Sequence, residues 1–330
     1  MSFKTAIVYS TDENYVKLTA VSVHSLLKHN PGAAIVILTS GVSDDSAAFL
    51  RQFVSARGGT CELVDVGQKL DQLRAKQANG YTSYSIYARY FAPELLHGKI
   101  ERFVYLDSDT LVVRSLRGLY NQDLQGKPFA VGYDCLLNSY KKLIGLKTNH
   151  PYFNTGVLLV DIERWIADKC SERFFSCLAE HVGKPLILPD QDILAFSIAA
   201  DATPLPPRYN FLTHFQLFRR ARDARFVMEI PSACWYGEEE FAAAQAKPAI
   251  HHFLGHTLGR PWFKESKNPL RPLYVQTAAE AGLPEVASQS RPLDFGYRVQ
   301  WLCWKLLPRP LFARACRAMY RYFFKSRYGI

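Results

Sequence analysis

Two aspartates interrupt an apolar run at residues 103–113, FVYLDSDTLVV. Asp107 and Asp109 are two residues apart, so on an extended backbone their carboxylates point to the same side. Side by side they repel each other, and each resists leaving water. A hard divalent cation removes that repulsion, because Mg²⁺ and Mn²⁺ prefer carboxylate oxygens. The pair therefore indicates a metal site, and such a site can stabilise a diphosphate leaving group.

A solvated turn is the competing interpretation of the acid pair. Asp and Ser are common turn residues, and an Asp-x-Asp triplet arises by chance in many proteins. The apolar flanks, residues 103–106 and 111–113, argue against this interpretation, because few solvated turns interrupt so hydrophobic a run.

Predicted strands and helices alternate in front of the acid pair. The order is strand 4–10, helix 15–30, strand 34–39, helix 44–57 and strand 61–66, and residues 103–106 continue the sheet. This order predicts an α/β fold with a Rossmann-like, mostly parallel sheet and helices on both faces. Ligands of such sheets bind beyond the carboxyl ends of the strands, where the acid pair and the polar residues 11–14 both belong.

Composition is that of an ordinary globular chain. The 330 residues are 48% hydrophobic, enough for one large core or two small ones. The seven cysteines are scattered without a CxxC pair, so we expect free thiols in a reducing compartment. Neither a signal-peptide pattern nor an apolar run of about 18 residues is found, which predicts a cytoplasmic protein without a membrane-spanning helix.

The C-terminal end carries most of the net charge of +10. From Phe295 onward the sequence has eight Lys or Arg and no Asp or Glu, which calls for an anionic partner. Residues 311–325 show the pattern of an amphipathic helix. Its basic arc consists of Arg314, Arg317, Arg321 and Lys325, and its apolar arc consists of Leu311, Phe312, Ala315, Met319, Tyr322 and Phe323.

This tail pattern predicts an interfacial helix at an anionic membrane surface. Trp301, Trp304, Phe312 and Phe323 would enter the interface while the basic residues meet lipid head groups. Docking of the tail onto the rest of the protein is the alternative. Nucleic-acid binding is a further one, which we do not expect.

Five stretches, in order along the chain, resemble glycosyltransferase family 8. They are the N-terminal strand leading into TDENY, TSYSIYARYFAPELL with LDSDTLVV, FNTGVLLVDIERW, DQDILAF and HFLGHTLGRPW, and together they cover roughly residues 4–264. The resemblance implies a retaining sugar transferase with the GT-A fold. Its nearest relatives would be the bacterial lipopolysaccharide galactosyltransferases and glucosyltransferases.

The same resemblance implies that Asp107, Asp109 and His252 ligate Mn²⁺. His252 is matched by its HxxG spacing to Gly255. Its neighbour His251 points to the opposite face of a strand and is expected to be structural. An imidazole ligand favours Mn²⁺ over Mg²⁺, which stays the alternative.

The resemblance also implies a set of residues that bind the nucleotide sugar. Around the uridine loop and the acid turn these are Ser10, Asp12, Asn14, Tyr15, Asp107, Ser108 and Asp109. For the sugar and the phosphates they are Arg89, Asp134, Asn154, Thr155, Gly156, Gly255 and Arg260. The alternative for Arg89 is a surface helix charge paired with a carboxylate.

The phosphate-binding segment departs from the family pattern. Arg260 replaces a lysine, and the segment from Gly255 to Arg260 is two residues longer. Arginine can still bind phosphate through two hydrogen bonds. His256 inside this loop either adds a contact or is an exposed loop residue.

The catalytic residues implied by the resemblance are Asp190 and Gln191, beside the anomeric carbon. Helix capping is the alternative, with Asp190 or Asp192 capping a helix that begins at Ile193. A double displacement needs a nucleophile, and the neutral amide of Gln191 is a poor one. We therefore expect front-face attack, in which the departing UDP oxygen accepts the acceptor's proton.

The expected protein is a cytoplasmic enzyme, peripheral on the inner face of the inner membrane. It would move galactose or glucose from a UDP-sugar to a lipopolysaccharide- or lipooligosaccharide-type acceptor. The expected domains are a catalytic domain at 1–265, an extended linker at 266–296 and a membrane-associating helical tail at 297–330. The alternatives are an inactive UDP-sugar-binding protein and a metal-dependent nucleotidyltransferase or phosphatase.

Overall fold

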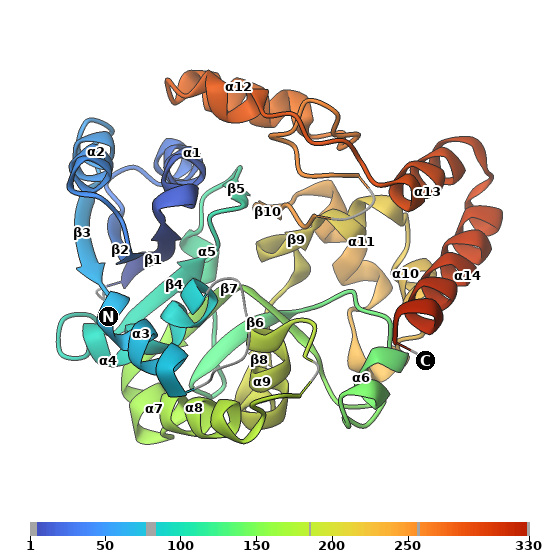
Figure 1. Cartoon of the computed structure of the whole chain (residues 1–330), viewed down its shortest axis with the longest axis horizontal. Coiled ribbons are helices and arrows are strands. Elements are labelled where there is room, and N and C mark those ends of the chain that lie inside the picture. Colours follow the sequence, from blue (N-terminus) through green and yellow to red (C-terminus); the bar gives the residue numbers. More distant parts are fainter. Residues whose placement is uncertain (1–4, 77–83, 185, 256–257, 329–330) are drawn as a thin grey trace. The chain divides into compact units, whose positions relative to one another are not determined.

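A computed structural model describes residues 5–76, 84–184, 186–255 and 258–328 (Figure 1). The chain forms two compact units, each made of separate stretches of sequence. The first unit comprises residues 1–132 and 153–205, and the second comprises residues 133–152 and 206–330.

The first unit is built on a seven-stranded sheet in the order β3-β2-β1-β4-β7-β6-β8. The strands are β1 (Thr5–Asp12), β2 (Ala34–Ser40), β3 (Thr60–Asp65), β4 (Arg102–Leu106), β6 (Phe129–Tyr133), β7 (Phe153–Asp161) and β8 (Ala202–Pro204). β1 pairs in parallel with β2 and β4, β2 with β3, and β6 with β8, whereas β4 and β7 are antiparallel. The mostly parallel α/β sheet predicted from the sequence is therefore confirmed.

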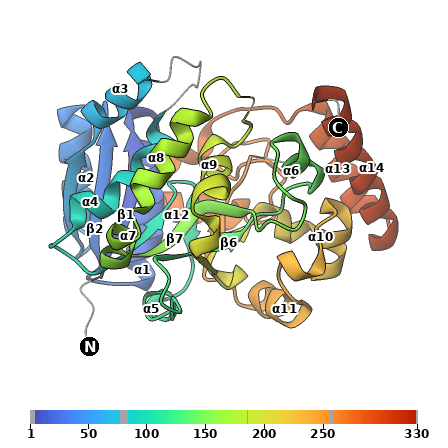
Figure 2. The ribbon, with the colours of Figure 1, turned by 90° about the horizontal axis from the view of Figure 1, so that it is seen from below.

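Helices cover both faces of this sheet. Those of the first unit are α1 (Val16–His29), α2 (Asp44–Ser55), α3 (Gly67–Lys76), α4 (Ala92–Leu96), α5 (Arg117–Tyr120), α7 (Ile162–Ala167), α8 (Cys170–Glu180) and α9 (Pro189–Ser197). Right-handed crossovers from β1 to β2 to β3 place α1 and α2 on one face. The return from β3 to β4 reverses direction, so α4 lies on the other face, where Figure 2 shows it with α7 and α8.

Short elements complete the first unit. They are the strand β5 (Thr110–Val112) and the 3₁₀ helices η1 (Glu13–Tyr15), η2 (Tyr84–Phe91) and η3 (Ala199–Asp201). Continuous apolar runs fill the sheet interior, because strands covered on both faces have no polar side. All four residues from Val157 to Val160 are buried, and Tyr9 and Tyr105 are fully buried.

The second unit is mainly helical. Its helices are α6 (Ser139–Leu143), α10 (Ala221–Met228), α11 (Glu238–Ala246), α12 (Arg271–Glu280), α13 (Phe295–Leu306) and α14 (Arg309–Tyr328). Its short elements are η4 (Pro207–Tyr209), β9 (Phe211–Leu212), η5 (Thr213–Leu217), η6 (Ser232–Cys234), β10 (Ile250–His252) and η7 (Pro284–Ser288). β9 and β10 are parallel, and an aromatic core with Phe215, Trp235 and Phe241 packs beside them.

The segment 266–296 is not the extended linker that the sequence suggested. It contains α12 and η7, and Tyr274 and Ala278 of α12 are buried. Four-residue spacing puts these two side chains on one helix face. The small residues between them carry little hydrophobic periodicity, which is why the helix was missed.

The tail prediction is correct in secondary structure but only partly correct about which side chains face outward: Leu311, Tyr322 and Phe323 are exposed, whereas Phe312 is buried. The helix α14 buries Phe312, Ala313, Cys316 and Phe324 in the second unit. Trp301 and Trp304 of α13 are half-buried against the same core, so they and Phe312 do not form an outward-facing surface. A helical wheel identifies an apolar face but does not say whether protein or lipid covers it.

Two residues of the predicted basic arc form ion pairs within the protein. Arg317 Nη2 lies 3.2 Å from Glu229 Oε1, and Arg321 forms a second ion pair with the same carboxylate.

Among the described residues no helix is long and apolar enough to cross a membrane.

Candidate active site

The acid pair lies in a fixed turn after the carboxyl end of β4. The Asp107 N–H donates to Gly156 O at 2.9 Å, and the Thr110 N–H and hydroxyl donate to Asp107 O at 3.1 and 2.7 Å. Asp107 and Asp109 each offer a carboxylate oxygen, and these two oxygens lie within 4.8 Å of each other. The turn thus holds two carboxylates close together, with the apolar strands β4 and β5 on either side.

Arg89 is the buried cation of this site. Its Nη2 lies 2.9 Å from Asp107 Oδ1, its Nη1 donates to Thr155 O at 2.5 Å, and its guanidinium carbon lies 4.4 Å from the centre of the Tyr105 ring. Burial alone would lower the pKa of Arg89, but the nearby Asp107, Tyr105 and Asp190 raise it above its ordinary value. Arg89 is only 5% exposed, so it is not the surface helix charge that was one alternative.

Asp190 and Gln191 lie in the first turn of α9, next to β7. Thr155 Oγ1 donates to Asp190 Oδ2 at 2.5 Å, and Arg89 Nη2 lies 3.9 Å from the same oxygen. Asn154 Nδ2 donates to Gln191 Oε1 at 2.9 Å. Burial raises the pKa of Asp190 despite the opposing effects of Arg89 and Thr155.

The capping alternative for this segment is wrong for Asp190. The helix begins at Pro189 and not at Ile193. The carboxylate of Asp192 accepts from the Leu188 N–H at 3.2 Å, whereas that of Asp190 is directed to Thr155 and Arg89.

The predicted uridine loop follows β1, beside the acid turn. Ser10 Oγ is 2.7 Å from the Tyr105 hydroxyl, and Ser108 Oγ donates to Ser10 O at 3.1 Å. The Asp12 carboxylate accepts from the Asn14 N–H at 3.0 Å and so caps η1. Tyr15 is 36% exposed, which leaves part of its ring accessible for stacking.

His252 and His251 have different surroundings in the second unit, as strand alternation predicts. His252 is 2% exposed and its Nδ1 lies 3.0 Å from Asn210 Oδ1. The amide oxygen can only accept, so Nδ1 carries the proton and Nε2 the lone pair. His251 packs against the rings of Phe211 and Phe253, and burial lowers its pKa to about 4.

The remaining predicted residues also lie in the second unit. Asp134 is 7% exposed, and its Oδ1 accepts from the Cys135 N–H at 2.6 Å. Arg260 packs against the backbone of Gly255, since a Cβ built on that glycine would lie 3.2 Å from Arg260 Nε. Gly255 therefore makes room for the arginine. His256 lies outside the described residues.

Two residues of the candidate site were missed in the sequence. Tyr105 donates its hydroxyl to Asp107 Oδ1 at 2.8 Å and also contacts Ser10 and Arg89. Strand alternation offered a signal, because Tyr105 is two residues before Asp107 and shares its face. Asn210, the partner of His252, is 42 residues away along the chain and has no local signal.

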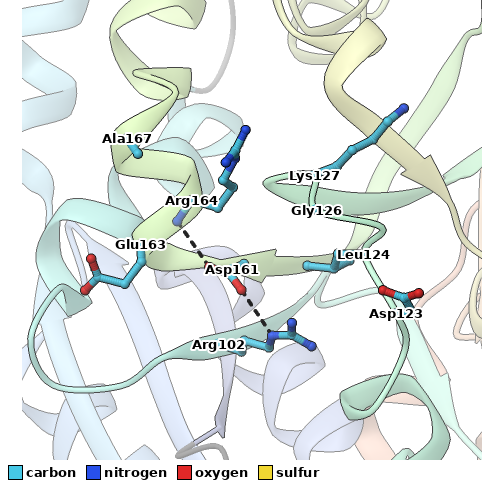
Figure 3. A pocket seen from close by; sticks show the side chains of 9 residues that line it. All are labelled: Arg102, Asp123, Leu124, Gly126, Lys127, Asp161, Glu163, Arg164 and Ala167. Atoms are coloured by element: carbon cyan, nitrogen blue, oxygen red, sulfur yellow. Dashed lines mark hydrogen bonds and ion pairs between the residues drawn. The ribbon is translucent and has the colours of Figure 1, made fainter.

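A separate pocket of about 470 Å³ lies at the opposite end of β4 (Figure 3). Arg102 begins β4 there, and its Nε lies 3.3 Å from Asp161 Oδ2 at the end of β7. Asp161 also accepts from the Arg164 N–H at 3.1 Å. None of the predicted site residues lines this pocket, and its charged groups include an ion pair made within the protein.

Comparison with known proteins finds bacterial relatives that are 24–27% identical to this chain. General stress protein A of Bacillus subtilis is 24% identical over 81% of this chain and 91% of its own length. A lipopolysaccharide 1,2-glucosyltransferase of Escherichia coli is 27% identical, but the match covers only 62% of this chain and 61% of that enzyme. Glycosyltransferase GlyF of Streptococcus pneumoniae is 25% identical over 88% of this chain and 65% of its own length.

Solved structures share the fold. The galactosyltransferase LgtC, in complex with donor and acceptor sugar analogs, superposes with a TM-score of 0.67 over 89% of this chain and 99% of LgtC, at 21% identity. That likeness establishes the GT-A fold. The family model described as "Glycosyl transferase family 8" matches residues 6–266, so the chain belongs to glycosyltransferase family 8.

Proposed function

We propose that this chain transfers galactose or glucose from a UDP-sugar to a hydroxyl group of a lipopolysaccharide- or lipooligosaccharide-type acceptor, with retention of the anomeric configuration. The observation that carries the proposal is the cluster of Asp107, Arg89 and Asp190 at the carboxyl end of β4, in a chain of this family. The lipopolysaccharide glucosyltransferase of Escherichia coli among its relatives supports the acceptor class.

The metal in this proposal is Mn²⁺, held by Asp107 and Asp109 of the first unit and by His252 of the second. The donor set fits: the two carboxylates lie close together, and Asn210 fixes the histidine tautomer whose Nε2 can bind a metal. Bound there, the ion would supply positive charge to the diphosphate leaving group. Mg²⁺ is the alternative, less suited to a nitrogen ligand.

The remaining predicted residues have assigned roles in donor binding. The uridine is held by Ser10, Asp12, Asn14, Tyr15 and Ser108, the sugar by Asp134, Asn154, Thr155 and Gly156, and the diphosphate by Gly255 and Arg260. Tyr15 fits a stacking role because its ring is partly exposed. Arg89 acts mainly through the carboxylates that it contacts.

The reaction proceeds by attack of the acceptor hydroxyl on the same face of the sugar from which UDP departs. The acceptor's proton passes to the departing phosphate oxygen as the new glycosidic bond forms. The contacts of Asp190 support this course over a covalent intermediate, because one of its oxygens is already engaged by Thr155 and Arg89. Gln191, oriented by Asn154, stabilises the positive charge that develops on the sugar.

The location belongs to the same proposal. An acceptor assembled on a lipid at the inner face of the cytoplasmic membrane would require a cytoplasmic enzyme that is peripheral on that membrane. The excess of basic residues after Phe295 supports this placement.

A UDP-release assay tests the proposal. Purified protein with Mn²⁺ is given UDP-galactose, UDP-glucose, UDP-GlcNAc and UDP-glucuronic acid, with a lipooligosaccharide acceptor. We expect UDP release with one of the first two donors and its loss in Asp109→Asn. Asp45→Asn, which changes an exposed carboxylate in the first turn of α2, serves as the matched control and should keep full activity.

Two other outcomes would replace the proposed function. Binding of UDP-sugars without turnover of any donor would indicate an inactive binding protein. Release of nucleoside monophosphate instead of UDP would indicate a phosphatase or nucleotidyltransferase that uses the same acids.

A further inference from the structure

The helix α13 has an outward face on which apolar and basic residues alternate. The residues of this face are Phe295, Arg298, Leu302, Lys305 and Leu306, and all five are exposed. At about 100° per residue they fall within an arc of roughly 100°. Phe295 is 82% exposed, Leu302 45% and Leu306 72%, which is unusual for large apolar side chains on one helix.

The start of α14 continues this surface. Pro308 and Pro310 are exposed beside the turn between the two helices, as are Leu311 and Arg314 in the first turns of α14. Figure 1 shows α13 and α14 as consecutive helices joined by a short turn at the C-terminal end of the chain. We call the five residues of α13 together with Leu311 and Arg314 the α13 outer surface.

The opposite side of the same helices is fixed to the protein. Trp301 and Trp304 pack against the core of the second unit, and Gln300 Nε2 donates to Cys316 Sγ at 2.9 Å between α13 and α14. Phe312, 1% exposed, anchors the start of α14. The α13 outer surface is therefore carried on a rigid support and is not a free tail.

The charge on this surface is of one sign. No Asp or Glu occurs from Phe295 to the last residue of the chain. Arg317 and Arg321 both form ion pairs with Glu229, whereas Arg298, Lys305 and Arg314 of the outer surface have no ion pair within 4 Å among the described residues. The apolar side chains are thus surrounded by cations that no carboxylate of the described chain balances.

We propose that the α13 outer surface docks onto an anionic lipid bilayer, with α13 lying in the plane of the membrane interface. Leucine and phenylalanine side chains enter the acyl boundary, and the basic side chains between them reach the head-group phosphates. At 1.5 Å per residue the 12 residues of α13 are about 18 Å long, enough to lie along the interface and too short to span it.

The chemistry of the surface favours lipid over other anionic partners. Three of the four apolar side chains on the surface are leucines, which cannot stack on the bases of a nucleic acid, and Phe295 offers the single aromatic ring. The proposal shares Leu311 and Arg314 with the helical-wheel prediction but moves the membrane contact from the rest of α14 to the exposed face of α13. It rests on the membrane location proposed above and names the surface that makes the contact, and lipid binding itself needs neither donor nor metal.

Co-sedimentation of the full chain with sucrose-loaded vesicles tests this proposal. Vesicles contain phosphatidylcholine alone or with about one third phosphatidylglycerol. We expect binding to the anionic vesicles and little to the neutral ones. The double variant Leu302→Ser/Leu306→Ser should lower the partition coefficient at least tenfold, since two leucines lose their apolar burial.

Two matched charge variants locate the binding surface. Arg298→Gln/Lys305→Gln should weaken binding to anionic vesicles by about thirtyfold, at about fivefold per charge near the surface. Arg317→Gln/Arg321→Gln removes the same charge from the side paired with Glu229 and should change binding less than about threefold. For each variant the unfolding temperature is measured, which reveals a folding defect. UDP release in the presence of a soluble acceptor is measured as well, which tests the transferase activity independently of membrane binding.

Equal losses in the two charge variants would overturn the proposal, because net charge and not this surface would then govern binding. Wild-type binding by the leucine variant would overturn it as well. A third contrary result is a dimer in sedimentation velocity that Leu302→Ser/Leu306→Ser dissociates, with no vesicle binding by the wild type. That result would make the surface an interface between copies of this chain.

Discussion

Arg89 is the residue on which the candidate site of the first unit depends. It contacts the carboxylates of Asp107 and Asp190 and stacks on Tyr105, and it is almost fully buried. A buried charge is tolerated only when it is paired, so each of these groups relies on the others. The acidic character of the site is thus balanced by a cation supplied by the fold.

Replacing Arg89 should destabilise the protein strongly. Arg89→Ala leaves Asp107 and Asp190 without their buried cation, and we expect a loss of about 3–5 kcal/mol in the free energy of unfolding, measured by urea denaturation. Arg164→Ala breaks the exposed i,i+4 pair with Asp168 and should cost less than about 1 kcal/mol. Equal stability of the two variants would show that Arg89 is not the structural cation of the site.

Tyr105 is predicted to act through Asp107. Tyr105→Phe removes the hydroxyl that donates to Asp107 Oδ1, so the carboxylate loses its orientation. We expect Mn²⁺ affinity in the presence of UDP to fall about tenfold, the usual effect of removing a group that orients a metal ligand. Tyr120→Phe at the end of α5 is the control, and an affinity loss as large there would remove the specific role of Tyr105.

Gln191 distinguishes front-face attack from a double displacement. Gln191→Ala should lower kcat by about a hundredfold through lost stabilisation of the positive sugar, and leave measurable turnover. The variant's fold is checked by circular dichroism. Complete loss of activity in a folded variant, or a sugar covalently trapped on Asp190 and detected by mass spectrometry, would contradict front-face attack.

At the scale of the elements, the helix α14, which was predicted to be a membrane-associating tail, packs into the core of the second unit. Its buried residues Phe312, Cys316 and Phe324 pack in the second unit, and Glu229 at the end of α10 pairs with Arg317 and Arg321. Removing the tail would expose this core, so a truncated chain is a poor test of membrane binding. Substitutions on the outer surface test it without that complication.

Phe312 should be a stability determinant of the second unit. Phe312→Ala opens a cavity in its core, and we expect a loss of about 3–5 kcal/mol, measured by thermal and urea unfolding. Leu311→Ala changes the adjacent, half-exposed side chain and should stay within about 1 kcal/mol. If Phe312→Ala unfolds like the wild type, α14 does not contribute to the core.

For the molecule as a whole, the features that could be predicted from the sequence are those encoded by local patterns, namely the strands and the polar residues that follow them. The predicted strands 4–10, 34–39 and 61–66 correspond to β1, β2 and β3, because each is a short stretch rich in apolar and β-branched residues between polar turns. The carboxyl ends of β1 and β4 carry the polar residues expected there. These features need only neighbouring residues to be recognised.

What the sequence did not predict depends on distant contacts. Residues 133–152 lie between two stretches of the first unit in the sequence but belong to the second unit, and no local sequence pattern indicates this assignment. The contacts of Arg89 with Asp190 and of His252 with Asn210 join residues 101 and 42 positions apart. The predicted outward face of the tail was wrong for Phe312, because this side chain packs in the core of the second unit, whereas Leu311, Tyr322 and Phe323 are exposed.

The most direct test of the central claim is a titration of Mn²⁺ in the presence of UDP, followed by electron paramagnetic resonance. We predict one tight site in the wild type. We also predict at least about tenfold weaker binding in Asp107→Asn, Asp109→Asn and His252→Ala, and no change in His251→Phe, whose side chain packs among rings. Wild-type affinity in His252→Ala or in either aspartate variant would contradict a shared metal site and the transferase mechanism built on it.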